Sequence, residues 1–444
     1  MSKGLLQRRV KWKDVRSPVC YLHPRDEILA AIQRIYRYRM TTTSGGNLSI
    51  LAENGDIWIT PAGIDKGTLR REDIVCVHPD GTVEGPHRPS SELPFHQAIY
   101  RARPDIGGIV HAHPVALVAF SLAHQVPDTR LFHQARHVCG EVGFAPYELP
   151  GSAELGRSVA EIFERKYNCV ILENHGTVTA GADLREAFDR FEALEFTGKT
   201  IIKACALGEV RYLSESEIAA AHQPAAGWEG FAHGSPSTTE KELRATLAEF
   251  VRRAYRRRLF ISTQGSFSAR LDGDAFLITP YHEDRGTLEA SDLVLVCGGE
   301  CEAGATPSRA ARIHAAIYAR YPEIGAIVNA YPVNATAFSV TGAPLDSRTI
   351  PESYIVIRQV GRVRYGVQFE DPAAVTETIS PGRPAALLEN DGVLVAGRTV
   401  LESYDRLEVL ESTAEAIINC RAIGTIAPMP EEVTRELDRV FLKQ

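Results

Sequence analysis

The most constraining feature of this 444-residue chain is that its two halves match each other along most of their length. Thr60-Pro61 recurs as Thr279-Pro280, and Leu172-Glu173-Asn174 recurs as Leu388-Glu389-Asn390, so partners lie 216 to 219 residues apart. Solenoid repeats have far shorter periods, of roughly 20 to 50 residues. The sequence therefore predicts one domain of about 210 residues that is present twice.

Each copy mixes helical and strand patterns. Apolar residues at helical spacing open the first copy, as Ile28, Ile32 and Ile35 show. Further along, short strands are predicted at 57–60 and 74–77, and helices at 94–103, 115–122, 152–166 and 184–207. Because strands and helices do not alternate strictly, we expect an α/β fold in which a mixed sheet lies between helical layers.

The boundary between the copies is predicted where Pro, Gly, Ser and His cluster and apolar periodicity ends. This gives a basic N-terminal arm at 1–22, a first domain at 23–224, a linker at 225–239 and a second domain at 240–444.

Composition excludes several partners and compartments. The formal charge of −7 gives no reason to expect nucleic acid or an anionic membrane. The arginine cluster at 252–258 lies on an amphipathic helix, which favours a solvated face over a nucleic-acid patch. No apolar run reaches the roughly 20 residues that span a bilayer. The basic N-terminus has no apolar h-region, so we do not expect it to be a secretory signal. Eight cysteines without a C-x-x-C pair predict the cytoplasm.

Three histidines form the strongest functional pattern. His111 and His113 follow the strand-like Ile109-Val110, and side chains two residues apart on a strand project from the same face. His175 ends a second apolar strand. The plain alternative is that these histidines only bond to backbone or water. Three neutral imidazoles would hold a divalent ion, most readily zinc, and leave positions open for substrate oxygens.

The second copy replaces this pattern while its apolar framework is retained. Asn329, Tyr331 and Asp391 stand in place of the three histidines, Ala310 in place of Glu92 and Ser266 in place of Asn47. Ordinary core histidines would have little reason to change together with a carboxylate. We therefore predict that the second copy is catalytically inactive and structural.

Five motifs occur in order in the first copy: Gly46-Asn47, Thr60-Pro61-Ala62-Gly63, Ser90-Ser91-Glu92, His111-x-His113 and Asn174-His175-Gly176. With them the chain resembles the class II aldolase/adducin-head family, whose fold is a three-layer one with a mixed sheet flanked by helices. The resemblance implies that His111, His113 and His175 are metal ligands. It also implies that Glu92 is the general acid/base. The plain alternative is that Glu92 is a helix N-terminal residue whose negative charge interacts favourably with the helix dipole.

The resemblance also implies a substrate. In the family, small polar residues and backbone N–H groups of three loops bind a phosphate. The residues at the matching positions here are Gly46, Asn47, Gly63, Ser90 and Ser91. Ala62 stands where sugar-phosphate aldolases usually carry Ser, so one hydroxyl of that cradle is missing. In the family a neighbouring subunit often supplies a tyrosine, and Tyr354 is the candidate here. Members of the family form rings of four domains, so we expect a homodimer of this chain.

The expected activity is that of a carbon-carbon lyase. We predict retro-aldol cleavage of a small ketose, phosphorylated at the end that meets the cradle, through an enediolate stabilised by zinc. Two alternatives stay open. One is a dehydratase or decarboxylase acting on a related phospho-sugar or keto acid, and the other is an adducin-like scaffold without catalysis.

Overall fold

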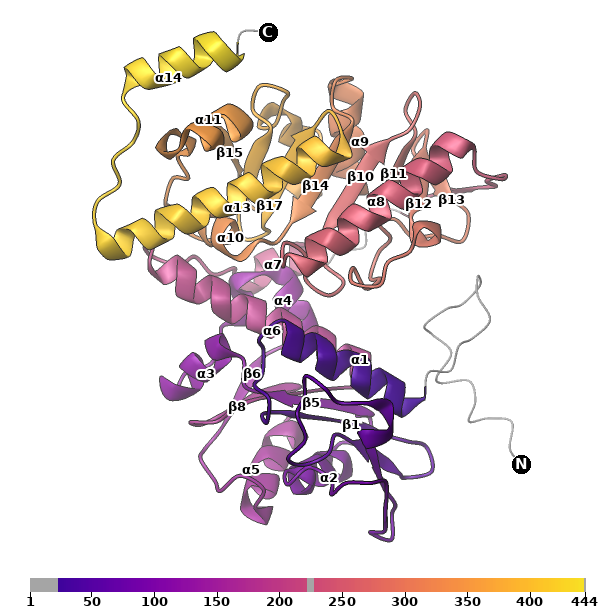
Figure 1. Ribbon diagram of the computed structural model, residues 1–444. Coiled ribbons are helices and arrows are strands. Elements are labelled where there is room, and N and C mark those ends of the chain that lie inside the picture. Colours follow the sequence, from indigo (N-terminus) through magenta and orange to yellow (C-terminus); the bar gives the residue numbers. More distant parts are fainter. Residues whose placement is uncertain (1–22, 222–226, 443–444) are drawn as a thin grey trace. The chain divides into compact units, whose positions relative to one another are not determined.

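The computed structural model of the protein describes residues 23–221 and 227–442 (Figure 1). The predicted arm at 1–22 and residues 225–226 of the predicted linker lie outside this part of the chain. The chain forms two compact units. Unit 1 contains the described part of Met1–His124 together with Gly143–Phe191, and unit 2 contains Gln125–Val142 together with the described part of Glu192–Gln444.

Unit 1 is built on an eight-stranded mixed sheet with the strand order β4-β3-β2-β1-β5-β8-β7-β6. The strands are β1 (Asn47–Leu51), β2 (Ile57–Ile59), β3 (Val75–Val77), β4 (Val83–Glu84), β5 (Gly108–Ala112), β6 (Val142–Ala145), β7 (Cys169–Leu172) and β8 (Gly176–Gly181). Antiparallel pairing sets Asn47 of β1 opposite His111 of the central strand β5. The start of β1 therefore lies beside the end of β5.

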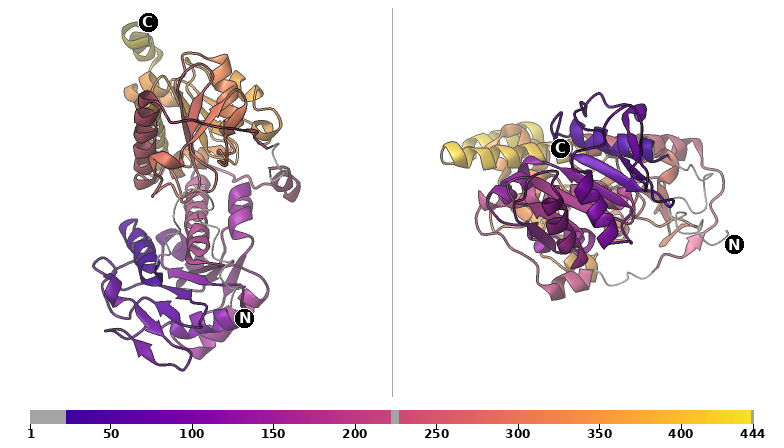
Figure 2. Two further views of the ribbon diagram at one scale, coloured as in Figure 1. Left: turned by 90° about the vertical axis from the view of Figure 1, so that its right-hand side faces the viewer. Right: turned by 90° about the horizontal axis from the view of Figure 1, so that it is seen from below.

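Helices cover both faces of this sheet (Figures 1 and 2). They are α1 (Pro24–Arg37), α2 (Leu93–Ala102), α3 (Val115–Leu122), α5 (Ala153–Glu164) and the first part of α6 (Leu184–Cys205). On one face, Phe95 of α2 and Phe163 of α5 pack against sheet residues such as Ile109. On the other, Ile32 of α1 and Phe191 of α6 do so. These two cores confirm the predicted three-layer fold.

The sequence explains where these helices begin. Ser152 caps α5, because its side chain accepts a hydrogen bond from the backbone N–H of Leu155 at 3.1 Å. From there, Leu155, Val159 and Phe163 recur on the buried face of the helix. Each of these large apolar side chains stabilises the fold by roughly 1.5 to 3 kcal/mol when it is fully buried.

Unit 2 repeats the same sheet with one strand added at its edge. Its order is β15-β16-β17-β14-β10-β11-β12-β13-β9. The strands are β9 (Gly230–Phe231), β10 (Ser266–Arg270), β11 (Phe276–Ile278), β12 (Val294–Cys297), β13 (Glu300–Glu302), β14 (Ala326–Ala330), β15 (Val360–Val363), β16 (Ala385–Leu388) and β17 (Val393–Gly397). Ser266 of β10 lies opposite Asn329 of β14, as Asn47 lies opposite His111. The two copies therefore share one strand register.

The helices of unit 2 are α4 (His133–Cys139), the later part of α6, α7 (Glu215–Ala221), α8 (Thr238–Arg256), α9 (Ala311–Arg320), α10 (Val333–Ser339), α11 (Pro351–Ile357), α12 (Val367–Glu370), α13 (Val400–Ile423) and α14 (Glu431–Leu437). In the described residues, no helix combines the length and the apolar character needed to cross a bilayer.

One segment of the first repeat lies within unit 2. It comprises Gln125–Val142 and includes α4. The side-chain amide of Asn390 donates to the carbonyl oxygen of Leu131 at 2.9 Å, and Arg136 pairs with Glu215 at 3.1 Å. The two compact units therefore do not contain the same stretches of chain as the two sequence repeats.

Candidate metal centre and catalytic site

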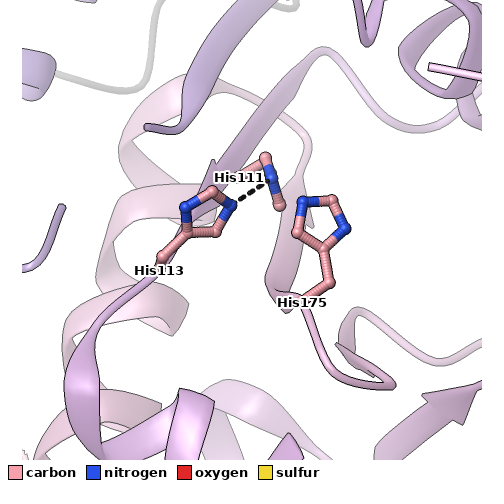
Figure 3. Close-up of side chains that lie close together, drawn as sticks. All are labelled: His111, His113 and His175. Atoms are coloured by element: carbon pink, nitrogen blue, oxygen red, sulfur yellow. Dashed lines mark hydrogen bonds between the residues drawn. The ribbon is translucent and has the colours of Figure 1, made fainter. Parts of the chain in front are cut away.

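Two strand ends bring the three histidines together (Figure 3). His111 lies in β5 and His113 just beyond it, while His175 lies in the turn between β7 and β8. The ring centroids of His111 and His113 are 4.8 Å apart, and those of His175 lie 4.9 and 5.0 Å from them. One nitrogen from each ring lies within 4.8 Å of the other two. This arrangement allows the three nitrogens to bind a single metal ion.

The hydrogen bonds of His111 prepare it to bind a cation. Its Nδ1 lies 2.9 Å from the carbonyl oxygen of Thr177, which can only accept, so Nδ1 carries the proton. The lone pair of Nε2 therefore faces the centre, where Nε2 of His113 lies 3.0 Å away. A metal-binding histidine is commonly oriented in this way through its other ring nitrogen.

Burial keeps the other two imidazoles neutral. Loss of water around His113 lowers its pKa to about 3, and the neighbouring His111 and His175 rings add to this shift. Burial likewise lowers the pKa of His175 to about 4, with a further contribution from His111. Because neutral imidazole is the form that binds a metal, the donor set of this site fits a divalent ion.

Gly176 leaves the space that His113 occupies. A Cβ atom at Gly176 would lie 2.5 Å from Cδ2 of His113 and 2.7 Å from the carbonyl oxygen of Ala112. Replacing Gly176 with alanine should therefore displace a ligand and weaken metal binding by about 10- to 100-fold. Competition with a chromophoric chelator measures this affinity.

The matched control for this variant is Gly392→Ala in the second copy. A Cβ atom there would approach the carbonyl oxygen of Ala330 to 2.3 Å, so this variant should also lose stability. It should leave metal affinity unchanged, since no imidazoles occupy the corresponding positions. Equal losses of affinity in the two variants would show that the effect is a general one on folding.

Glu92 directs its carboxylate at the histidines. It lies at the start of α2 and makes no side-chain capping hydrogen bond. Its Oε2 lies 3.2 Å from Nε2 of His111, and its Oε1 lies 3.3 Å from Nε2 of His175. Burial alone would raise the pKa of Glu92, but the two histidines and a hydrogen bond from Asn47 outweigh it and hold that pKa below its usual value. The site therefore contains an ionised carboxylate.

A buried chain of hydrogen bonds orients Glu92. The amide of Asn47 donates to Oε2 of Glu92 at 2.7 Å, and its Oδ1 accepts from Nε2 of His96 at 2.5 Å. Nδ1 of His96 lies 2.6 Å from the hydroxyl of Ser49, which in turn lies 2.7 Å from the hydroxyl of Tyr100. The contact between Asn47 and Glu92 was not predicted from the sequence. The available signal was that the second copy replaces both residues.

The second copy retains the outer part of this chain and lacks the centre. Ser268 lies between the hydroxyl of Tyr318 and Nδ1 of His314, at 2.7 Å from each. Nε2 of His314 donates to Asn329 at 2.7 Å, the residue that stands in place of His111. The Tyr-Ser-His arrangement therefore belongs to the framework shared by both copies.

In the second copy, the residues at two of the three histidine positions are hydrogen-bonded to each other. The hydroxyl of Tyr331 donates to Asp391 at 3.0 Å, and the amide of Gln368 donates to its other oxygen at 3.2 Å. Burial raises the pKa of Asp391 to about 6. Within residues 23–221 and 227–442, groups of three potential metal ligands occur only in the first copy.

The loops of the predicted phosphate cradle border the catalytic site. Gly46 has a φ of +73°, and a Cβ atom there would lie 2.8 Å from the carbonyl oxygen of His111. Open space surrounds the Cβ position of Gly63. The hydroxyl of Ser90 accepts from the backbone N–H of Glu92 at 3.3 Å, and Ser91 is exposed. These contacts join the cradle loops to the strand and helix that carry the site.

A buried lysine also ties these loops together. Nζ of Lys66 donates to the carbonyl oxygen of Pro61 at 3.1 Å, and its backbone N–H donates to Thr43. Burial lowers the pKa of Lys66 to about 8. The counterpart Arg285 makes the same link to Pro280 in the second copy, which indicates a framework role.

Tyr354, the predicted cross-interface residue, lies in α11 of unit 2. Its hydroxyl donates to Asp438 at 2.9 Å. Its counterpart in the first copy, 218 residues earlier, is Arg136, and the sequence offers no tyrosine in that part of the first copy.

Relatives of this chain are enzymes that act on sugar phosphates. A 5-deoxy-D-ribulose 1-phosphate aldolase of Bacillus thuringiensis is 33% identical over 198 residues, which are 44% of this chain and 91% of the relative. A 3-oxo-tetronate 4-phosphate decarboxylase of Pectobacterium atrosepticum is 38% identical over 185 residues, which are 40% of this chain and 83% of the relative. Each relative therefore has about the length of one copy.

A solved structure and a family model also match this chain. The crystal structure of YgbL from Escherichia coli is 31% identical, with a TM-score of 0.41, and the match covers 44% of this chain and 95% of YgbL. The model of the class II aldolase and adducin N-terminal domain matches residues 26–202 and, a second time, residues 245–418. The chain therefore belongs to the class II aldolase and adducin N-terminal domain family and carries that domain twice.

Proposed function

We propose that the first copy is a metal-dependent lyase that cleaves a small ketose by retro-aldol chemistry. The observation that carries this proposal is that three imidazoles and one ionised carboxylate meet in a single buried site. Relatives that include a 5-deoxy-D-ribulose 1-phosphate aldolase and an L-fuculose phosphate aldolase support it.

His111, His113 and His175 would hold the ion, and a set of three histidine nitrogens fits zinc best. When bound, such an ion polarises a substrate carbonyl and stabilises the negative charge that develops as the neighbouring carbon-carbon bond breaks. Thr177 contributes by fixing the tautomer of His111. The protein supplies the orientation of all three ligands before substrate arrives.

Glu92 would move the proton. Its two oxygens lie 3.2 and 3.3 Å from the ligand nitrogens, so an atom of a substrate bound at the centre lies within their reach. As an ionised carboxylate it accepts the proton that the substrate hydroxyl loses when the bond breaks. It then returns a proton to the carbon that the bond leaves behind. Asn47 keeps the carboxylate in place between these steps.

The cradle of Gly46, Asn47, Gly63, Ser90 and Ser91 would bind the phosphate of the substrate. Loop amides and hydroxyls are suitable for an anion, and the relatives named above act on phosphorylated sugars. Ala62 provides no hydroxyl to this cradle, and the amide of Asn47 is already bound to Glu92. Phosphate recognition is therefore tested by comparing matched ketoses with and without a terminal phosphate. An equal kcat/KM for the two would contradict phosphate recognition.

A decarboxylase is the second candidate, because a relative with that activity is 38% identical. Loss of CO₂ from a 3-oxo acid also leaves a carbanion beside a carbonyl, so the same site would serve. A panel of ketose 1-phosphates and phosphorylated 3-oxo acids separates the two, since aldehyde release indicates the lyase and CO₂ release the decarboxylase. The panel also detects dehydration. If no member of the panel reacts, a non-catalytic scaffold is favoured.

We further propose that two chains form a ring in which first domains (23–224) alternate with second domains (240–444). In this ring, Tyr354 of one chain would enter the catalytic site of the other. Light scattering should then give about 97 kDa, which is twice the chain mass of 48.7 kDa. A monomer in solution would contradict the ring, and full turnover by Tyr354→Phe would contradict the role of the tyrosine.

A further inference from the structure

A second group of metal-binding side chains lies on β2 and β3, away from the three histidines in sequence. Asp56 immediately precedes β2, Cys76 lies in β3 and His78 immediately follows that strand. One ligand atom from each lies within 4.8 Å of the other two. Cys76 and His78 are two residues apart, so they project from the same face of the sheet. Antiparallel pairing of the two strands holds Asp56 beside them.

Neighbouring residues hold these side chains in the orientation of ligands. Nδ1 of His78 lies 2.8 Å from Oδ1 of Asp56. The second oxygen of Asp56 accepts a hydrogen bond from the amide of Asn54 at 2.7 Å. Nε2 of His78 lies 3.9 Å from a carboxylate oxygen of Glu84 on the adjacent strand β4. A hydrogen-bonded carboxylate is typical of metal sites, and the hydrogen bond from Asn54 gives Asp56 this feature.

The fold itself does not require these residues. The second copy has the same strands in the same register, because Leu277 pairs with Leu295 as Trp58 pairs with Cys76. At the three positions it carries Ala275, Leu295 and Cys297. All three ligand positions therefore differ in the copy that also lacks the three histidines. A buried Leu295 shows that an ordinary apolar side chain satisfies this position.

We propose that Asp56, Cys76 and His78 form a second site for a divalent metal ion, separate from the three-histidine centre. Thiolate, imidazole and carboxylate together are a donor set that suits zinc, with water in the fourth position. On binding, the thiol proton and the proton shared by His78 and Asp56 leave to solvent. Cys76 is a free thiol, and His78 is partly exposed, which gives an ion access. The site would bind β2 to β3 and so stabilise the sheet.

Cobalt distinguishes this site from the first, because only a cysteine ligand produces an intense thiolate-to-cobalt charge-transfer band in the near ultraviolet. The test uses the full chain with His113→Ala, so that the three-histidine centre is disabled. Titration with Co²⁺ should give this band with one ion per chain. Adding Cys76→Ser should remove the band and weaken cobalt binding at least about 100-fold. The control, Cys301→Ser in the same background, should retain both.

His78→Ala provides a second variant that does not alter the buried thiol. In the His113→Ala background it should also weaken cobalt binding strongly, while circular dichroism verifies that the chain is folded. A band that persists without Cys76, or a His113→Ala chain that binds no cobalt, would overturn the proposal. This result is independent of the proposed lyase activity, which requires the other site.

Discussion

Replacing His113 with alanine should remove the ion from the three-histidine centre and lower kcat/KM by roughly 1000-fold or more, since an ion in this role contributes several kcal/mol to the transition state. Two imidazoles cannot hold the ion firmly, and the substrate carbonyl would lose the cation that polarises it. Elemental analysis of the purified variant, together with steady-state kinetics on the best substrate of the panel, measures both effects.

The matched control is Asn329→Ala, which alters the second copy at the position of His111. It should leave activity and the metal bound by the first copy unchanged. Asn329 contacts His314, which belongs to the framework shared by both copies, and the second copy has no three-histidine centre. Normal turnover by His113→Ala would end the catalytic assignment. A loss of activity in Asn329→Ala would show that the second copy takes part in the reaction.

Replacing Glu92 with glutamine should lower kcat by about 100- to 10,000-fold, the usual contribution of a general acid/base, while the three-histidine centre keeps its ion. Glutamine has nearly the same shape and can still accept the hydrogen bond from Asn47, but it cannot take up a proton at neutral pH. Steady-state kinetics and metal analysis of the same preparation separate these two properties.

Loss of the ion together with activity in Glu92→Gln would assign the carboxylate to metal retention instead of proton transfer. Turnover at the wild-type rate would show that another group moves the proton. Restoring a carboxylate in the second copy, as Ala310→Glu, should not rescue the variant, because that copy has Tyr331 and Asp391 in place of imidazoles.

The fold was largely predictable because it depends on local periodicity repeated twice. The helix predicted at 94–103 occurs at Leu93–Ala102, and the one predicted at 115–122 occurs at Val115–Leu122. The membership of Gln125–Val142 in unit 2 was not predictable. It depends on contacts such as Asn390 to Leu131, between residues 259 positions apart, and no local pattern reports such contacts.

The candidate site was predictable where strand geometry decides the outcome. Side chains two residues apart on a strand share a face, so His111 and His113 were expected to lie together. In the structure His175 lies beside them. The roles of amides were harder to assign, since an asparagine side chain can donate or accept in either direction. Asn47 was predicted only in the phosphate cradle, whereas its amide contacts Glu92 as well. The roles of the three histidines, Glu92, Tyr354 and the cradle residues stay predictions.

The hydrogen-bonded Asp391 of the second copy has an evolutionary consequence. Converting Tyr331 to histidine would recreate one ligand, but it would also remove the hydroxyl that donates to a fully enclosed carboxylate. Converting Asp391 first would leave both Tyr331 and Gln368 without their acceptor. Either of these two replacements, made alone, is therefore expected to be less stable than the present chain. These hydrogen bonds would oppose a return of metal ligands to the second copy one residue at a time.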